Sequence, residues 1–293
     1  MSIRIAAVFL ALIMAIGNVK ADTLPLRVFM QPEDYDAPAT QYGNNLDAGH
    51  YAAAPDDGAK LYYEVYGEGQ PVLVMHGGGV GCPYEMGQLV DSLRALNKYQ
   101  VILMTTRGHG RSEIGANKVN YTQRGTDAHA VLSPVTKQPA VVIGFSDGAY
   151  ASYKLASMYP ESVKKLVAIG AGENLDQLRK IVPSTVDAMK KVDPQFMDAW
   201  MSVMPEPQRL QEYWRDFYEM YNTTIMSKEL FMSIKCPVLV MAGELDPNAP
   251  LATVIAAYQQ IPQSQLAIIA GAPHPVLIAN FNACWTNIRP FME

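Results

Sequence analysis

Short apolar runs recur along the chain, and most of them end in loops that carry glycine or polar residues. Six such runs, rich in Val, Leu and Ile, have the length of buried strands and lie at 71–75, 100–104, 139–143, 165–169, 237–242 and 266–270. Stretches with helical character separate them, for example at 88–97, 126–132 and 149–156. This alternation predicts an α/β fold with a mostly parallel, doubly wound sheet, whose functional residues lie at the carboxyl ends of the strands.

Two further segments extend this pattern toward the N-terminus. Residues 50–54 and 60–66 flank the turn Pro55-Asp56-Asp57-Gly58, which predicts an antiparallel hairpin at the edge of the sheet. Residues 22–48 are rich in Pro, Asp, Asn and Tyr and show no periodicity, so we expect an extended arm that lies on the domain. The predicted core comprises 49–171 and 235–293.

The pattern changes over 172–234, where no strand is predicted. Helices are expected at 175–181, 184–192, 194–204 and 206–221, which together form an inserted helical cap over the mouth of the site. The cap is rich in Met, Trp, Tyr and Phe. These side chains either form an adaptable apolar wall for a ligand or pack the cap onto the core.

The central motif is Gly144-Phe145-Ser146-Asp147-Gly148, which follows an apolar run and precedes a helix-like stretch. A serine on such a turn is held in a strained conformation with its hydroxyl above the sheet, and the glycines allow strand and helix to approach. Ser146 is therefore the candidate nucleophile of an acyl-transfer enzyme. A tight turn that merely requires glycine is the alternative.

A second motif, His76-Gly77-Gly78-Gly79, follows the run at 71–75. Loops of this type expose backbone N–H groups, and donors aimed at a developing oxyanion stabilise the transition state by about 3–4 kcal/mol each. The expected oxyanion donors are the backbone N–H groups of Gly78 and Asp147. A phosphate-binding loop is disfavoured because no Lys-Ser or Lys-Thr follows the glycines.

Two later strands end in an acid and a histidine. Asp246 follows the run at 237–242, and His274 follows the last run. His274 is expected to accept the Ser146 proton, while Asp246 fixes the histidine tautomer. Glu244, two residues earlier, is the competing acid.

The order Ser146, Asp246, His274 resembles the triad of the α/β-hydrolase superfamily, and the resemblance runs from about residue 50 to the C-terminus. The loop 106–112 resembles the R-G-x-G-x-S loop of these enzymes. The resemblance implies an eight-stranded, mostly parallel sheet with an inserted cap. The Ser-Asp-Gly turn is similar to that of valacyclovir hydrolase-like α-amino-acid esterases, which implies that the Asp147 side chain holds a substrate α-amino group. A carboxylate that caps the following helix is the alternative for Asp147.

Charge and composition narrow the classes of function. The net charge of −5 and the scattered basic residues give no electrostatic case for nucleic acid or an anionic membrane. No cysteine spacing suggests a metal site, and Cys82, Cys236 and Cys284 are expected to be buried apolar side chains. We therefore expect no metal or other cofactor and a small-molecule substrate. The oligomeric state is not predicted.

The first 21 residues resemble a secretory signal peptide. One positive charge precedes an apolar stretch of about twelve residues, and small residues suitable for cleavage follow. The stretch is too short for a permanent membrane span, which favours a cleaved signal peptide. A retained N-terminal anchor is the alternative. The mature chain is expected to begin near Asp22, in the periplasm or outside the cell, without stable membrane insertion.

Taken together, the motifs predict a secreted serine hydrolase that cleaves carboxylic esters through an acyl-enzyme on Ser146. Amino-acid esters and lactones are candidate substrates. Amidase, peptidase or C–C bond hydrolysis by the same triad remains the near alternative, and a non-catalytic binding protein of the same fold is the remote one.

Overall fold

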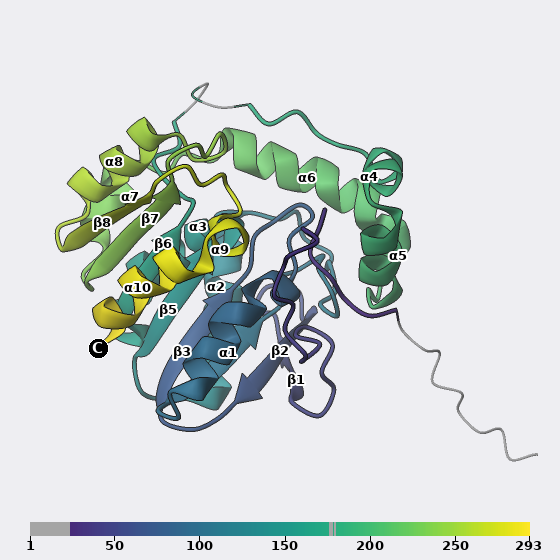
Figure 1. Cartoon of the computed structure of the whole chain (residues 1–293), viewed down its shortest axis with the longest axis horizontal. Helices are drawn as coiled ribbons and strands as arrows, with labels where there is room; N and C mark the ends of the chain where they lie inside the picture. The colour runs from purple at the N-terminus through teal and green to yellow at the C-terminus, as the bar shows by residue number, and fades with distance from the viewer. Residues whose placement is uncertain (1–23, 176–177, 179) are drawn as a thin grey trace, which may run out of the picture.

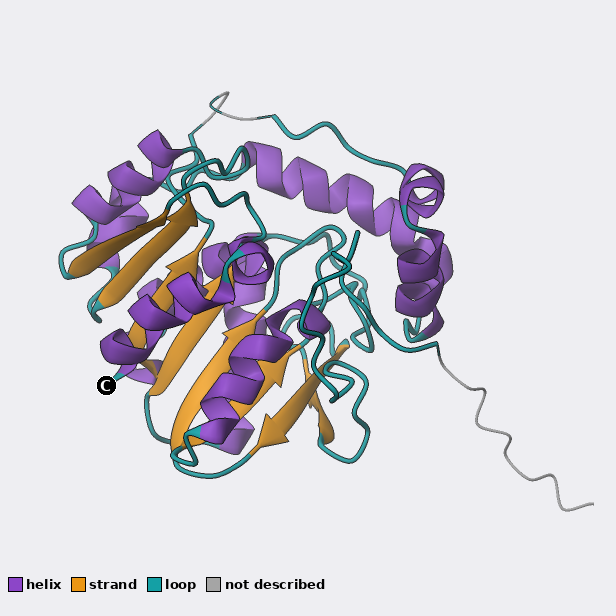
Figure 2. Cartoon of the chain, in the orientation of Figure 1, coloured by secondary structure: helices purple, strands orange, loops and turns teal. Residues whose placement is uncertain are grey.

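The computed structural model describes residues 24–293 except 176, 177 and 179, and the predicted signal peptide lies outside the described residues. Its centre is an eight-stranded sheet in the order β1-β2-β4-β3-β5-β6-β7-β8. Figure 2 shows the strands as one twisted layer between helices. The strands are β1 Gly49–Ala53, β2 Lys60–Tyr66, β3 Gln70–Met75, β4 Tyr99–Met104, β5 Ala140–Phe145, β6 Val163–Ile169, β7 Val238–Gly243 and β8 Ser264–Ile269.

Strand direction follows the predicted pattern. β1 and β2 form an antiparallel hairpin at one edge, and β2 pairs antiparallel with β4. All pairings from β3 and β4 through β8 are parallel. β5 and β7 are buried along their whole length, as expected for strands covered on both faces. The predicted mostly parallel α/β sheet with an edge hairpin is therefore confirmed.

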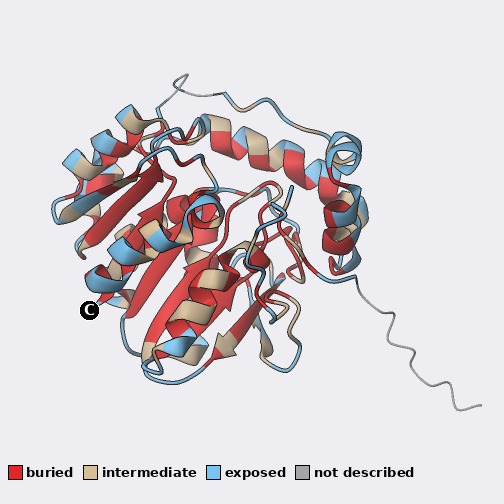
Figure 3. Ribbon diagram, viewed as in Figure 1, coloured by how far each residue is buried: buried red, intermediate tan, exposed pale blue. Residues whose placement is uncertain are grey.

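Helices cover both faces of the sheet. In Figure 1, α1 and α10 lie in front of the strands, and α2 and α3 lie behind them. Figure 3 shows exposed and half-buried residues on the outward side of α1 and α10, whereas α3 behind the sheet is buried over most of its length. The core helices are α1 Gly87–Ala95, α2 Tyr121–Val135, α3 Asp147–Met158, α7 Lys228–Ser233, α8 Leu251–Gln260, α9 Val276–Ala279 and α10 Phe281–Met292, and the short 3₁₀ turns are η1 Pro83–Met86, η2 Pro160–Ser162 and η3 Pro207–Arg209.

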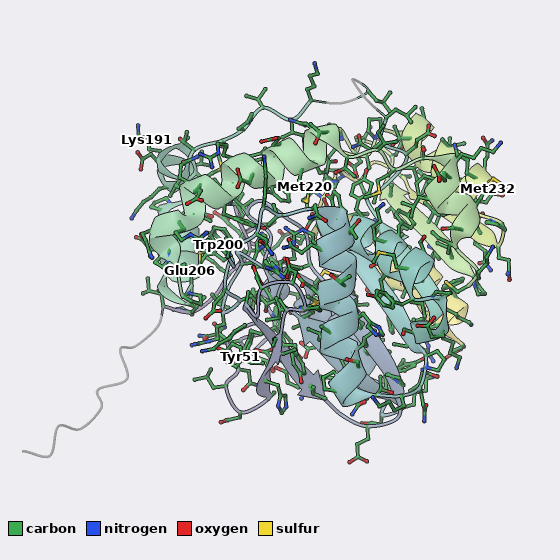
Figure 4. All side chains as sticks on the ribbon, turned by 180° about the vertical axis from the view of Figure 1, so that it is seen from behind. Tyr51, Lys191, Trp200, Glu206, Met220 and Met232 are labelled. Atoms are coloured by element: carbon green, nitrogen blue, oxygen red, sulfur yellow. The ribbon has the colours of Figure 1, made fainter. Side chains whose placement is uncertain are left out.

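Three helices lie above the carboxyl ends of the strands, in the region where a cap was predicted. They are α4 Val186–Val192, α5 Pro194–Ser202 and α6 Leu210–Thr223, and α6 crosses above the sheet in Figure 1. Trp200 of α5 and Trp214 of α6 stack with ring centroids 6.0 Å apart, and both are buried. Viewed from behind in Figure 4, Trp200 and Met220 lie on the inner side of these helices, whereas Lys191 lies on the outside.

The expected helix at 175–181 is wrong for the described residues of that stretch, none of which is helical. The Asn222 side chain accepts a hydrogen bond from the Ile181 N–H (2.8 Å) and donates one to the Ile181 carbonyl oxygen (2.9 Å). Pro183, two residues on, also disfavours helical geometry at the residue before it. Tertiary hydrogen bonds therefore replace the local helix. The six-residue helix α7 was not predicted.

Residues 24–48 contain turns but neither helix nor strand, and they lie against the domain. The buried Glu64 carboxylate of β2 accepts hydrogen bonds from the backbone N–H groups of Gly43 (3.0 Å) and Asn45 (2.8 Å). At the other end of this arm, Asp193 accepts from the Met30 N–H (2.8 Å) and also caps α5. The arm is thus tied both to the sheet edge and to the capping helices.

A buried arginine joins the edge hairpin to the centre of the fold. The Arg107 side chain, in the loop after β4, is fully buried and donates to Asp127 of α2 (2.6 Å) and to Asp57 of the hairpin turn (2.8 Å). It also pairs with Asp56. Burial acts to raise the pKa of Asp57, but backbone N–H groups and Arg107 hold that pKa below its ordinary value. Arg107 therefore supplies the charge that allows these acids to be ionised inside the protein.

We predict that Arg107→Ala lowers the free energy of unfolding by about 3–5 kcal/mol, because it leaves buried carboxylates without a counter-charge. Urea denaturation followed by circular dichroism measures the change. Arg289→Ala, which removes an exposed arginine paired with Glu293, is the control and should cost less than about 1 kcal/mol. Equal losses for the two variants would contradict the role assigned to Arg107.

Candidate active site

Ser146 occupies a sharp turn between the central strand β5 and helix α3. Its φ of 52° is unusual for a residue with a side chain and is a strained backbone conformation. The turn closes because its flanking positions lack side chains: a Cβ on Gly148 would lie 2.6 Å from the carbonyl oxygens of Met75 and His76. The strained conformation expected from the motif is therefore present.

Three side chains from the ends of different strands form one hydrogen-bonded relay. His274 Nε2 lies 2.9 Å from Ser146 Oγ, and His274 Nδ1 lies 2.7 Å from Asp246 Oδ2. The second Asp246 oxygen accepts from the backbone N–H groups of Asn248 and Ala249, both at 2.8 Å. Asp246 is thus held on both sides, and it can hold His274 with Nδ1 protonated and Nε2 free to accept a proton.

The competing acid lies elsewhere. Glu244 is exposed, and its Oε2 accepts a hydrogen bond from the Gly271 N–H (2.8 Å) at the start of the loop that carries His274. Asp246 rather than Glu244 contacts the histidine ring. Glu244 supports the loop by a surface hydrogen bond.

The two residues whose backbone N–H groups are expected to face an oxyanion, Gly78 and Asp147, lie in contact. A Cβ added to Gly78 would lie 2.9 Å from the Asp147 Cβ, so the glycine loop and the start of α3 are in contact beside Ser146. Within the described residues, neither the Gly78 nor the Asp147 N–H donates to a protein acceptor. Two unpaired donors next to a serine hydroxyl form the arrangement that an oxyanion site requires.

A cavity of about 330 Å³ opens directly onto Ser146 and His274. Its walls are mostly apolar and aromatic, and they come from the arm, the glycine loop, the capping helix α6 and the start of α9. The lining includes Phe29, Gly77, Gly78, Glu85, Phe145, Ile181, Phe217, Tyr218, Tyr221, Asn248, Pro275 and Ile278. A larger surface hollow of about 690 Å³, beside Tyr35 and Phe281, contains no member of the relay.

Both interpretations of the cap residues apply, but to different residues. Phe217, Tyr218 and Tyr221 of α6 line the cavity. The methionines of residues 172–234 are absent from its described lining. Met197 of α5 is buried, and Met232 of α7, at the periphery in Figure 4, is about half exposed. The wall of the cavity is therefore aromatic rather than methionine-rich.

Comparisons with known proteins agree with this architecture. Residues 70–202 match a family model described as the alpha/beta hydrolase fold. The chain is 35% identical over 113 residues to the uncharacterized hydrolase YraK of Bacillus subtilis, covering 38% of this chain and 40% of YraK. It is 34% identical over 128 residues to a proline iminopeptidase of Xylella fastidiosa, covering 41% and 39%. The matches thus span about two fifths of the length of these curated relatives.

Among solved structures, a serine hydrolase involved in carbazole degradation (the CarC enzyme) superimposes with a TM-score of 0.69 at 19% identity, covering 83% of this chain and 98% of that one. At this identity the likeness concerns the fold. The chain has the alpha/beta hydrolase fold, and the family model covers residues 70–202 of its 293.

In this α/β-hydrolase fold, the Asp147 side chain does not reach the cavity. It is 1% exposed, and its Oδ2 lies 3.3 Å from Nη1 of the equally buried Arg124 on α2. We expected this carboxylate to hold a substrate amino group. It is not accessible to a substrate, because Asp147 is buried and already faces the cation of Arg124. The resemblance to α-amino-acid esterases had suggested the opposite, since sequence does not show which way a side chain turns.

The pair belongs to a buried polar layer beneath the cavity. Arg124 Nη2 donates to the Tyr213 hydroxyl (2.6 Å), and Phe217 packs over the guanidinium 5.8 Å from its ring centre. His76 is buried beside it, with Nε2 accepting from the Thr106 N–H (3.1 Å). Burial lowers the pKa of His76 to about 3, so this histidine is a neutral structural residue.

The three cysteines, Cys82, Cys236 and Cys284, are all buried and unpaired in this structure. Burial raises the pKa of each thiol, which keeps it protonated and unreactive. No helix in the described part of the chain is long and apolar enough to cross a membrane.

We predict that Arg124 and Asp147 are energetically coupled, because removing either partner leaves the other as an isolated buried charge. A double-mutant cycle with Arg124→Met and Asp147→Asn, measured by urea denaturation, should give a coupling energy of about 1–3 kcal/mol. The exposed pair Lys118 and Glu219 serves as the control, with less than about 1 kcal/mol expected. Additive losses at Arg124 and Asp147 would contradict the pairing.

Proposed function

We propose that this protein is a serine hydrolase that cleaves carboxylic esters through an acyl-enzyme on Ser146. The observation that carries the proposal is the relay from Asp246 through His274 to a serine in a strained turn at the floor of a cavity. A nucleophile, a base and an orienting acid within hydrogen-bond distance make up the machinery of acyl transfer.

The first half of the reaction forms the acyl-enzyme. Ser146 Oγ attacks the ester carbonyl carbon while His274 Nε2 accepts the hydroxyl proton. The carbonyl oxygen becomes an oxyanion and accepts hydrogen bonds from the Gly78 and Asp147 N–H groups. When the intermediate collapses, the C–O bond to the alcohol breaks, and His274 returns the proton to the departing alkoxide.

Water completes the cycle. His274 accepts a proton from a water molecule, whose oxygen attacks the acyl carbon through the same oxyanion site. Collapse releases the carboxylic acid and restores the Ser146 hydroxyl with the proton that His274 held. Every group that the proposed cycle uses is a side chain or backbone N–H of this chain or a water molecule.

The cavity walls favour an apolar substrate, and the ease of expelling the leaving group favours an ester over an amide. Aromatic and aliphatic side chains suit an apolar acyl or alcohol group, and an ester needs less help in expelling its leaving group than an amide does. A panel of p-nitrophenyl esters, p-nitroanilides, amino-acid esters and lactones separates ester hydrolysis from amidase and peptidase activity.

We predict that a fluorophosphonate probe labels Ser146 and that Ser146→Ala abolishes both labelling and turnover. The loss of kcat is expected to be on the order of 10⁶, as in other triads. Peptide mass spectrometry locates the label. Ser133→Ala, at the far end of α2, is the matched control and should retain labelling. Normal ester hydrolysis by the Ser146→Ala variant would exclude the proposal.

We predict different effects for the two neighbouring acids. Asp246→Asn should lower kcat by about 10⁴, because an amide at this position favours the wrong His274 tautomer. Glu244→Gln should change kcat by less than about tenfold, because the amide oxygen still accepts from the Gly271 N–H. Steady-state kinetics on one ester compares the variants, and the reverse ranking would assign the acid to Glu244.

We further propose that the chain is exported and loses its first 21 residues. The support is the charged start, the apolar stretch and the small residues before Asp22. N-terminal sequencing of protein recovered from cell fractions tests this, and an intact N-terminus in the membrane fraction would indicate a retained anchor instead.

A further inference from the structure

Glu85 is a carboxylate in the wall of the cavity that the triad does not use. It lies in the 3₁₀ turn η1, directly after the glycine loop, and it lines the same cavity as Ser146 and His274. Its Oε1 accepts a hydrogen bond from the Gly77 N–H (2.6 Å), which fixes the carboxyl group beside the oxyanion loop.

No cation of the described chain compensates Glu85. No lysine or arginine forms an ion pair with it, and none is among the described residues that line the cavity. Two fully buried acids do have cationic partners, since Asp147 faces Arg124 and Asp127 faces Arg107. The buried Glu64 accepts hydrogen bonds from the Gly43 and Asn45 N–H groups and has no ion pair within the described residues. Among the described residues that line the cavity, Glu85 is therefore the one acid, and no described cation pairs with it.

The surroundings of Glu85 disfavour its ionised form when the cavity holds no cation. Burial raises the pKa of Glu85 to about 8, although the Gly77 and Cys82 N–H groups act to lower it. A carboxylate that is costly to ionise in a cleft is typical of a functional residue. A positive charge brought into the cavity by a ligand would offset this cost.

Aromatic rings complete a site suited to such a charge. Phe29 of the arm and Phe217, Tyr218 and Tyr221 of α6 line the cavity with Glu85. The faces of aromatic rings attract cations, and alkylammonium groups are commonly recognised by aromatic walls together with a carboxylate. The chemistry of the cavity thus matches an organic cation rather than an anion.

We propose that Glu85 is a specificity-determining residue that selects ester substrates carrying an alkylammonium group. The inference rests on the proposed ester hydrolysis and adds its substrate class. It assigns the recognition of a positive charge to Glu85 and not to Asp147, which Arg124 neutralises.

Matched ester pairs test the selection. Butyrylcholine and 3,3-dimethylbutyl butyrate have the same shape, but only the first carries a charge, on the alcohol side of the ester. Ethyl esters of trimethylammonioacetic acid and 3,3-dimethylbutyric acid place the same difference on the acyl side. In at least one pair, we expect the cationic ester to be preferred in kcat/KM by about tenfold or more.

Glu85→Gln keeps an oxygen that accepts from the Gly77 N–H but removes the charge. The substitution should abolish the preference for the cationic ester in whichever pair shows it. Glu68→Gln removes the same charge from the exposed turn before β3 and is the control, for which the preference should persist. If Glu85 only supports the loop, the substitution lowers kcat/KM equally for both members of each pair, and an unchanged ratio overturns the proposal.

The pH dependence of the preference gives a second signature. Ionisation of Glu85 increases as pH rises through about 8, so the ratio of kcat/KM between cationic and neutral esters should rise over pH 7–9 in the wild type. His274 affects both members of a pair equally and cancels in the ratio. The other titratable groups near Glu85 are Cys82, whose pKa burial raises, and the phenols of Tyr35, Tyr218 and Tyr221.

A measurement of cation binding alone tests the Glu85 site independently of the proposed ester hydrolysis. Calorimetry on the Ser146→Ala protein should detect benzyltrimethylammonium at pH 9, with about tenfold weaker binding when Glu85→Gln is added. No difference between these proteins would reject the cation site even if esters are cleaved. Cation binding without any ester hydrolysis by the wild type would retain the site and reject the esterase proposal.

Discussion

The functional site depends on one backbone constraint, the turn that places Ser146 between β5 and α3 with a φ of 52°. The central position of β5 in the sheet holds one end of the turn, and the packing of α3 holds the other. Gly148 lets the turn approach the carbonyl oxygens of β3 and its loop. The same geometry exposes the Ser146 hydroxyl and leaves the Asp147 N–H without an acceptor, so the nucleophile and one oxyanion donor arise together.

The charged side chains around this turn fall into two groups, those paired in the interior and those that line the cavity. Arg107 and Arg124 each lie in the interior and pair with buried acids, Asp127 and Asp147 respectively. The charges of these two buried acids are therefore balanced within the protein. Asp246 and His274 form the polar part of the cavity that performs the chemistry. Glu85 is the acid that lines the cavity, where the described residues supply it with hydrogen bonds but no cation. Specificity for charge at this site is therefore expected to come from Glu85.

Local pattern predicted the core well and the cap only in part. Strands such as β5 and β7 are short apolar runs with glycine or polar residues behind them, and parallel pairing follows from that pattern. The stretch 175–181 has helical character but is not helical in its described residues, because the Asn222 side chain takes both backbone groups of Ile181. The six-residue α7 was missed because so short a helix leaves little periodicity in the sequence.

The sequence by itself determined the fold class and the identity of Ser146, Asp246 and His274 as candidates, because strands that end at the same edge of a parallel sheet bring their following loops together. Only the tertiary structure decided how the remaining acids are used. Asp147 turns toward Arg124 on the neighbouring helix α2, whereas Glu85 lines the cavity. Side-chain direction and the charge of spatial neighbours depend on packing between distant segments, which local sequence pattern does not encode.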